Sequence, residues 1–161
     1  MNSGDVRTTR GSVPHRLPGI ARLAVALEIF LAIGALLGGG MLILSPSGHL
    51  LGMPLSLLAG TPFQSFLVPG LLLFTFIGVA PVLAAVVTAR RQAIAPLAAV
   101  AVGLTLMGWI TVEMVMLAGP ASLAWALYLV LGTVIATVGV GWWRSGTARK
   151  TSPGGFAPGR R

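Results

Sequence analysis

Four long apolar runs dominate the chain, and short segments rich in turn-forming or polar residues separate them. The runs cover roughly residues 21–44, 66–89, 96–118 and 120–143. Each exceeds the roughly 20 residues that a helix needs to cross the hydrocarbon core of a bilayer. The pattern therefore predicts an all-α protein, a membrane-embedded four-helix bundle.

Composition supports lipid as the solvent of this chain. Hydrophobic residues make up 55% of it and charged residues only 9%, whereas a soluble domain carries about 25% charged residues. Residues 1–19 and 144–161 are basic and polar, with many Gly, Ser and Pro residues. Such segments cannot bury a core, so we expect a disordered N-terminal arm and C-terminal tail around one transmembrane domain, residues 20–143.

The positive charges predict the orientation. All 11 Lys and Arg residues lie in the arm, in the tail or at Arg22, Arg90 and Arg91, and segments 45–65 and 118–121 contain none. Basic residues in short flanking loops stay in the cytoplasm. This rule predicts that both termini are cytoplasmic and that the protein resides in the cell inner (plasma) membrane. The net charge of +8 then reflects topology and attraction to anionic lipid headgroups at the cytoplasmic face, with no role for nucleic acid.

Small and aromatic residues recur at helical spacing and predict which helix faces pack together. The first run contains Ala21, Ala24, Glu28, Ala32, Ala35 and Gly39; the second contains Gly70, Phe74, Gly78, Pro81 and Ala85; the fourth contains Trp125, Tyr128, Gly132, Ala136, Gly139 and Trp143. Leu31 lies beside the first stripe and is expected to face outward.

Prolines and aromatic residues add local expectations. Pro81 is interior to the second run and should kink its helix. Gly119 and Pro120 predict a tight turn between the third and fourth runs. Trp125 and Tyr128 are expected near the outer membrane interface, with Trp142 and Trp143 at the inner one, as in an aromatic belt.

Two carboxylates carry the candidate chemistry. Glu28 falls on the small-residue stripe of the first run, where a charge costs several kcal/mol unless it is neutral, paired or hydrated. It is either a proton or cation site, a structural hydrogen-bonding group, or an acid paired with Arg22, Arg90 or Arg91.

Glu113 lies near the outer end of the third run. It either snorkels to the interface or binds a proton or ligand. His49 and Gln64 in the outer segment 45–65 are its expected polar partners. That segment is either an interfacial half-helix, a lid over the outer mouth, or a loop packed on the end of the bundle.

Motifs for other chemistry are not found. The chain contains no Cys and only two His, so a disulfide scaffold is excluded and a closed zinc site is not expected. It has no HExxH, GxSxG or Walker motif. We therefore assign no catalytic residue, no metal site and no cofactor.

The stretch GMPLSLLAGTPFQSFLVPGLLLFTFIGVAPVLAAV (52–86), followed by GWITVEMVML (108–117), resembles an uncharacterised family of small four-span integral membrane proteins of high-GC, actinobacterial-type bacteria. The resemblance covers roughly residues 20–143 and implies a topology without an activity. Glu28 in the first span is also similar to the first-helix Glu of small multidrug-resistance exporters, which exchanges protons for cationic drugs. The long arm, the outer loop and Glu113 depart from that second family.

Three functions are compatible with these features. The scarcity of polar residues within the spans favours a non-enzymatic accessory or partner-binding component, with a membrane-protein partner or a second copy of the chain. A small proton-coupled transporter would use Glu28 and also Glu113. An enzyme embedded in the membrane and acting on a lipid or quinone is the third reading.

Overall fold

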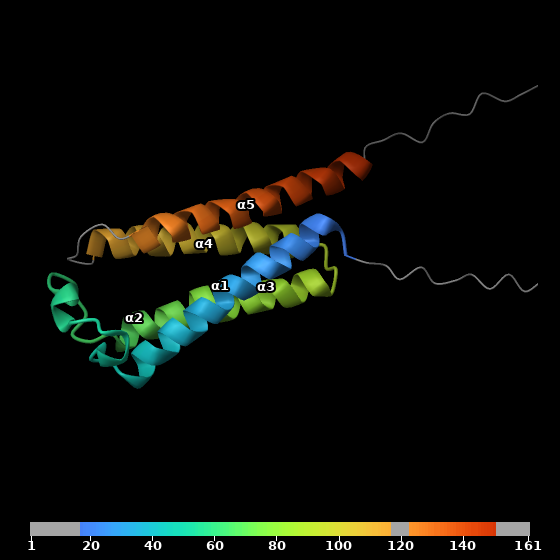
Figure 1. Cartoon of the computed structure of the whole chain (residues 1–161). Coiled ribbons are helices and arrows are strands. Elements are labelled where there is room, and N and C mark those ends of the chain that lie inside the picture. The colour runs from blue at the N-terminus through green and yellow to red at the C-terminus, as the bar shows by residue number, and fades with distance from the viewer. Residues whose placement is uncertain (1–16, 117–122, 151–161) are drawn as a thin grey trace, which may run out of the picture.

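The computed structural model describes residues 17–116 and 123–150. Its elements are α1 (Gly19–Leu44), η1 (His49–Leu51), η2 (Leu55–Leu58), α2 (Leu67–Leu72), η3 (Leu73–Val79), α3 (Ala80–Ala89), α4 (Ala95–Met116) and α5 (Leu123–Lys150). The elements α2, η3 and α3 follow one another as a single helix, so the described part of the chain contains four long helices (Figure 1).

All four helices are long and apolar enough to cross a membrane. The candidate spans are Gly19–Leu44, Leu67–Ala89, Ala95–Met116 and Leu123–Ser145. Many large apolar side chains on their surface are exposed, as they are where helices face lipid. The protein is a multi-pass membrane protein, and the predicted all-α four-helix bundle is confirmed.

The last helix is longer than the sequence predicts, and some predicted features lie outside the described residues. Helix α5 continues to Lys150, beyond its expected end at residue 143. The predicted Gly119–Pro120 turn, residues 1–16 and residues 151–161 lie outside the described residues.

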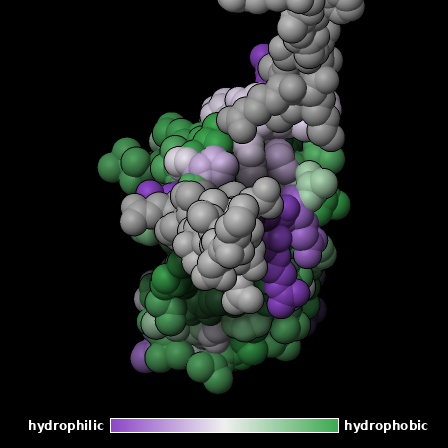
Figure 2. All heavy atoms as spheres, turned by 90° about the vertical axis from the view of Figure 1, so that its right-hand side faces the viewer, coloured by the Kyte–Doolittle hydropathy of each residue, from purple (hydrophilic) through white to green (hydrophobic). Residues whose placement is uncertain are grey.

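The two ends of the bundle differ in character. Arg22, Arg90, Arg91 and Arg144 all lie at the end where α1 begins, which we call the arginine end (Figure 1). Figure 2 looks onto this end and shows hydrophilic atoms beside flanks of apolar atoms. The opposite end carries residues 45–66 and is called the loop end.

The bundle consists of two closely packed hairpins. The first hairpin is α1 with α2, η3 and α3, and the second is α4 with α5. A Cβ atom on Gly39 would lie 2.7 Å from the backbone nitrogen of Phe74, and one on Gly103 would lie 2.5 Å from the carbonyl oxygen of Gly132. Side chains of any size would therefore force these backbones apart, as expected for small-residue helix contacts in lipid.

The predicted packing faces are confirmed for the first hairpin. All six residues of the stripe on α1 are buried. On the second span, Gly70, Gly78, Pro81 and Ala85 are buried and Phe74 is half-buried. The stripe on α5 is buried at Gly132 and Gly139, whereas Tyr128 and Trp143 are exposed.

The outward placement of Leu31 is wrong. Its side chain is only 2% exposed and belongs to a central cluster to which every long helix contributes residues. The cluster contains Leu31, Ala35, Ile77, Ala84, Val102, Leu106, Ile110 and Ile135. Helix α1 contacts the other helix of its own hairpin and also α5 of the second hairpin. Its buried face is therefore wider than one stripe of small residues.

The helix around Pro81 departs from α-helical geometry. Residues Leu73–Val79 form a π-helix, and the N–H of Ala80 donates a hydrogen bond to the carbonyl of Thr75, five residues earlier. A proline clashes with the carbonyl four residues before it, and a wider turn relieves that clash. The distortion expected at Pro81 therefore takes the form of a π-helical segment, which is a recognised site of helix bending.

The loop end is folded onto the bundle. Residues 45–66 contain the 3₁₀ turns η1 and η2, and the N–H of Phe66 donates a hydrogen bond to the carbonyl of Pro46 at 2.8 Å. Leu42, Leu58 and Phe66 form a small buried cluster under these turns. Of the three alternatives for this segment, the structure shows a loop packed on the bundle. The segment also forms one wall of a cleft.

Candidate functional site

Glu113 is held inside the bundle by an indole group. The Nε1–H of Trp109, one turn earlier on α4, donates a hydrogen bond to Oε1 of Glu113 at 2.6 Å. Trp125 on α5 lines the same cleft as this carboxyl group. The carboxyl group therefore faces the other helix of the second hairpin and keeps further lone pairs for another donor.

Two adjoining clefts between the hairpins meet at this carboxyl group. The first, the apolar cleft, is open to the outside, and its walls include Leu42, Met53, Phe63, Phe66, Val112 and Met116. The second, the aromatic cleft, is also open and is bordered by Gly34, Gly38, Leu106, Ile110, Trp125 and Tyr128. Leu73, Trp109 and Glu113 line both clefts.

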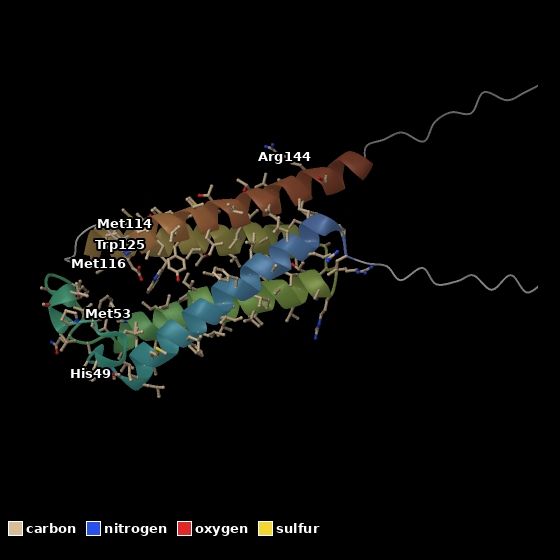
Figure 3. The ribbon with its side chains drawn as sticks, viewed as in Figure 1. His49, Met53, Met114, Met116, Trp125 and Arg144 are labelled. Atoms are coloured by element: carbon tan, nitrogen blue, oxygen red, sulfur yellow. The ribbon has the colours of Figure 1, made fainter. Side chains whose placement is uncertain are left out.

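The polar partners expected for Glu113 do not reach it. His49 and Gln64 are exposed, and neither lines either cleft. Figure 3 shows His49 on the far side of the loop end from Trp125. Glu113 itself is half-buried and points into the clefts. Its partner is therefore an indole of the second hairpin, and the snorkelling alternative is not what the structure shows.

Trp125 also differs from its expected role in an aromatic belt. Its side chain is half-buried and packs against the central hydrophobic cluster. Its side chain therefore packs on apolar groups and also borders the cleft that contains Glu113. The spacing of four residues between Trp109 and Glu113 is one sequence signal for this arrangement, but no sequence pattern indicates that Trp125 borders Glu113 from another helix.

Glu28 occupies a different environment in the first hairpin. Its side chain is fully buried, and within the described residues neither Oε1 nor Oε2 has a hydrogen-bond partner. Thr88, on the adjoining helix α3, is also fully buried with an unpartnered Oγ1. Buried polar groups are nearly always hydrogen-bonded, so this pair of orphaned groups marks a second candidate site.

The arginines proposed as partners of Glu28 are exposed. Arg22, Arg90 and Arg91 have exposed side chains at the arginine end. None donates a hydrogen bond to the Glu28 carboxyl group, which has no such partner within the described residues. The expected ion pair is therefore not formed, and Glu28 remains a buried acid among small apolar residues.

The two carboxylates belong to separate sites. At a rise of about 1.5 Å per residue, Glu28 lies about 14 Å along α1 from Gly19, and Glu113 about 27 Å along α4 from Ala95. Both helices begin at the arginine end (Figure 1). Thr105 and Thr111 of α4, which could have contributed to a polar path between the acids, are exposed on the outside of the helix. Tyr128 borders the aromatic cleft beside Glu113.

The site contains no recognisable metal centre. Among residues 17–116 and 123–150 no three His, Cys, Asp or Glu side chains gather closely enough to hold a metal ion. Comparisons with protein-family models, with curated proteins and with solved structures find no match to this chain. The two carboxylates and the clefts are therefore the features of the molecule that indicate a function.

Proposed function

We propose that this protein is a non-enzymatic membrane component that binds a hydrophobic ligand in the clefts between its two hairpins. One observation carries the proposal: the carboxyl group of Glu113, held by Trp109 at 2.6 Å, is exposed to clefts whose other walls are mainly apolar. Ligand sites commonly combine apolar walls with a few fixed polar groups. Glu113 would orient the ligand and the apolar walls would bind its body.

The orientation of the protein is part of the proposal. Arg22, Arg90, Arg91 and Arg144 gather at one end of the bundle, and the loop end carries no Lys or Arg between residues 45 and 66. Basic flanks stay cytoplasmic. We therefore place both termini in the cytoplasm and the clefts in the outer half of the plasma membrane, where they would receive ligands from the outer leaflet.

The binding proposal is tested with two glycines of the same helix. Gly38 borders the aromatic cleft, whereas a side chain on Gly40 would meet nothing within 4 Å. A Cβ on Gly38 would make only an ordinary contact, 3.8 Å from Leu73. Gly38→Leu should therefore fill the cleft without unfolding the bundle, and Gly40→Leu is the matched control.

The readout is fluorescence from the indoles beside Glu113. In a background with Trp142→Phe and Trp143→Phe, Trp109 and Trp125 are the two remaining tryptophans. In nanodiscs of phosphatidylglycerol, the uncharged probe 1-bromododecane should quench their emission saturably. Gly38→Leu should abolish the saturable part and Gly40→Leu should retain it. Quenching that stays linear, or that both variants leave unchanged, would refute binding in the clefts.

A small proton-coupled transporter is the second candidate, and Glu28 is the observation that favours it. A fully buried acid without a hydrogen-bond partner is costly in a membrane and commonly marks a proton or ion site. In liposomes with an internal pH dye, Glu28→Gln should abolish proton movement coupled to solute uptake. Equal proton fluxes in the natural protein, the variant and empty liposomes would remove this candidate.

A further inference from the structure

The charges lining the clefts narrow the class of ligand. Among the described residues that line the clefts, Glu113 is the one charged side chain, and none is Lys, Arg or His. The described arginines lie toward the arginine end of the bundle, where Figure 3 labels Arg144. A carboxyl group in apolar surroundings favours a partner of positive charge, and an anionic headgroup would gain no opposite charge there.

The side chains around Glu113 add a second preference. Trp109, Trp125 and Tyr128 border the aromatic cleft together with the carboxyl group. Aromatic ring faces attract ammonium groups, most strongly when water is excluded, and aromatic cages of this kind hold quaternary ammonium ligands. Gly34 borders the same cleft, and a Cβ at this position would lie 3.9 Å from the Tyr128 hydroxyl, so glycine places no side chain between α1 and the Tyr128 hydroxyl.

The two clefts match the two ends of an amphiphile, because one cleft is apolar and the other contains aromatic rings with polar groups. The apolar cleft extends from Glu113 toward Met53, Phe63 and Met116 and is lined almost wholly by hydrocarbon and aromatic side chains. The aromatic cleft contains the indoles and the Tyr128 hydroxyl. A ligand with its nitrogen beside Glu113 would place its tail in the apolar cleft, where burial of apolar area stabilises it.

From these contacts we infer that the occupant of the clefts is a single-chain amphiphile with a cationic nitrogen, held by Glu113 and the surrounding rings at its head and by the apolar cleft along its tail. This inference rests on the proposed function, and it specifies the chemistry of the ligand. The complementarity of charge selects the amine, and the apolar cleft selects the chain.

Competition between charged and uncharged probes tests the ligand class. Dodecyltrimethylammonium should displace 1-bromododecane from the tryptophan background described above, and dodecyl sulfate should displace it at least tenfold less well. Glu113→Gln keeps a carbonyl oxygen that can accept the Trp109 hydrogen bond, so the fold should be retained. Relative to its own affinity for 1-bromododecane, this variant should lose at least tenfold in its affinity for dodecyltrimethylammonium.

The outcomes separate the two claims. If 1-bromododecane does not bind saturably, the proposed function itself fails. If it binds but Glu113→Gln leaves the affinity for dodecyltrimethylammonium unchanged, the cation specificity is overturned while the binding proposal stands. A repeat in phosphatidylcholine tests the source: strong competition by the lipid would reassign the occupant to a choline headgroup, whereas an unchanged affinity supports the free amphiphile.

Discussion

The indole nitrogen of Trp109 lies 2.6 Å from Oε1 of Glu113, one turn away on α4. This contact turns a carboxyl group that could have extended to the membrane surface back into the bundle. Hydrogen bonds to charged groups contribute more than neutral ones, and within membranes such interactions typically contribute about 0.6–1.7 kcal/mol. It is the best-defined polar contact between side chains of the spans.

A double-mutant cycle measures this contact. Trp109→Phe removes the donor and keeps an aromatic ring, and Glu113→Leu removes the acceptor. We expect a coupling free energy of about 1–2 kcal/mol in unfolding experiments. Trp142→Phe combined with Glu113→Leu serves as the control and should be additive. A coupling near zero for the Trp109 pair would mean that the contact does not stabilise the bundle.

Close packing in the second hairpin predicts unequal effects at two glycines of α4. A Cβ on Gly103 would lie 2.5 Å from the Gly132 carbonyl oxygen, whereas one on Gly108 would meet nothing within 4 Å. Gly103→Ala should lower the free energy of unfolding by about 1–3 kcal/mol through overpacking, and Gly108→Ala should leave it nearly unchanged. Similar melting temperatures for both variants would contradict the tight α4–α5 contact.

Leu31 offers a test of the central cluster. Its side chain is 2% exposed, while that of Leu37 on the same helix is 60% exposed. Leu31→Ala should cost about 2–5 kcal/mol of unfolding free energy because it leaves a cavity, and Leu37→Ala should cost far less. Thermal unfolding in detergent measures both, and an equal loss would place Leu31 on the lipid face after all.

Replacing Glu28 with an apolar residue should raise the free energy of unfolding. Within the described residues its oxygens have no hydrogen-bond partner, so Glu28→Met breaks no contact and removes a buried polar group. We expect the variant to gain about 1–3 kcal/mol in unfolding free energy. Ala26→Met at an exposed position of α1 is the control. A marked loss of stability in Glu28→Met would show instead that a bound group partners the carboxyl.

The proposed orientation predicts where reporters function. A reporter active only in the cytoplasm should be active when fused after Arg161. A reporter active only outside the cytoplasm should be active when inserted at Gly60, which is exposed and has open space around it. Activity of the cytoplasmic reporter at Gly60 would reverse the proposed topology.

Hydropathy and small-residue spacing were sufficient to predict the helices and much of their packing. The four spans agree with the predicted runs to within a few residues at the ends that the structure describes, and the α1 stripe from Ala21 to Gly39 is buried as expected. Both signals are local, since one depends on the length of an apolar run and the other on helical periodicity.

The wrong expectations share a physical origin. In water, exposing a leucine side chain costs free energy, so a leucine beside a packing face tends to be buried. In a membrane, the free energy of a leucine is similar whether it faces protein or lipid. The sequence therefore could not distinguish Leu31 in the core from Leu37 on the surface. The Glu113 site also depends on packing between helices that no local sequence pattern encodes, because Trp125 borders it from a different helix and the clefts depend on how far the two hairpins diverge.

The π-helical segment Leu73–Val79 has a consequence for the register of the second span. A π-helical turn accommodates one residue more than an α-helical turn, so it offsets the residues that follow by about 100° relative to those before it. The offset lets Gly70 in one half and Ala84, Ala85 and Thr88 in the other all lie against neighbouring helices. Deleting a single residue between 73 and 79 would restore a regular helix and swivel one half of the span, turning Thr88 or Gly70 toward lipid.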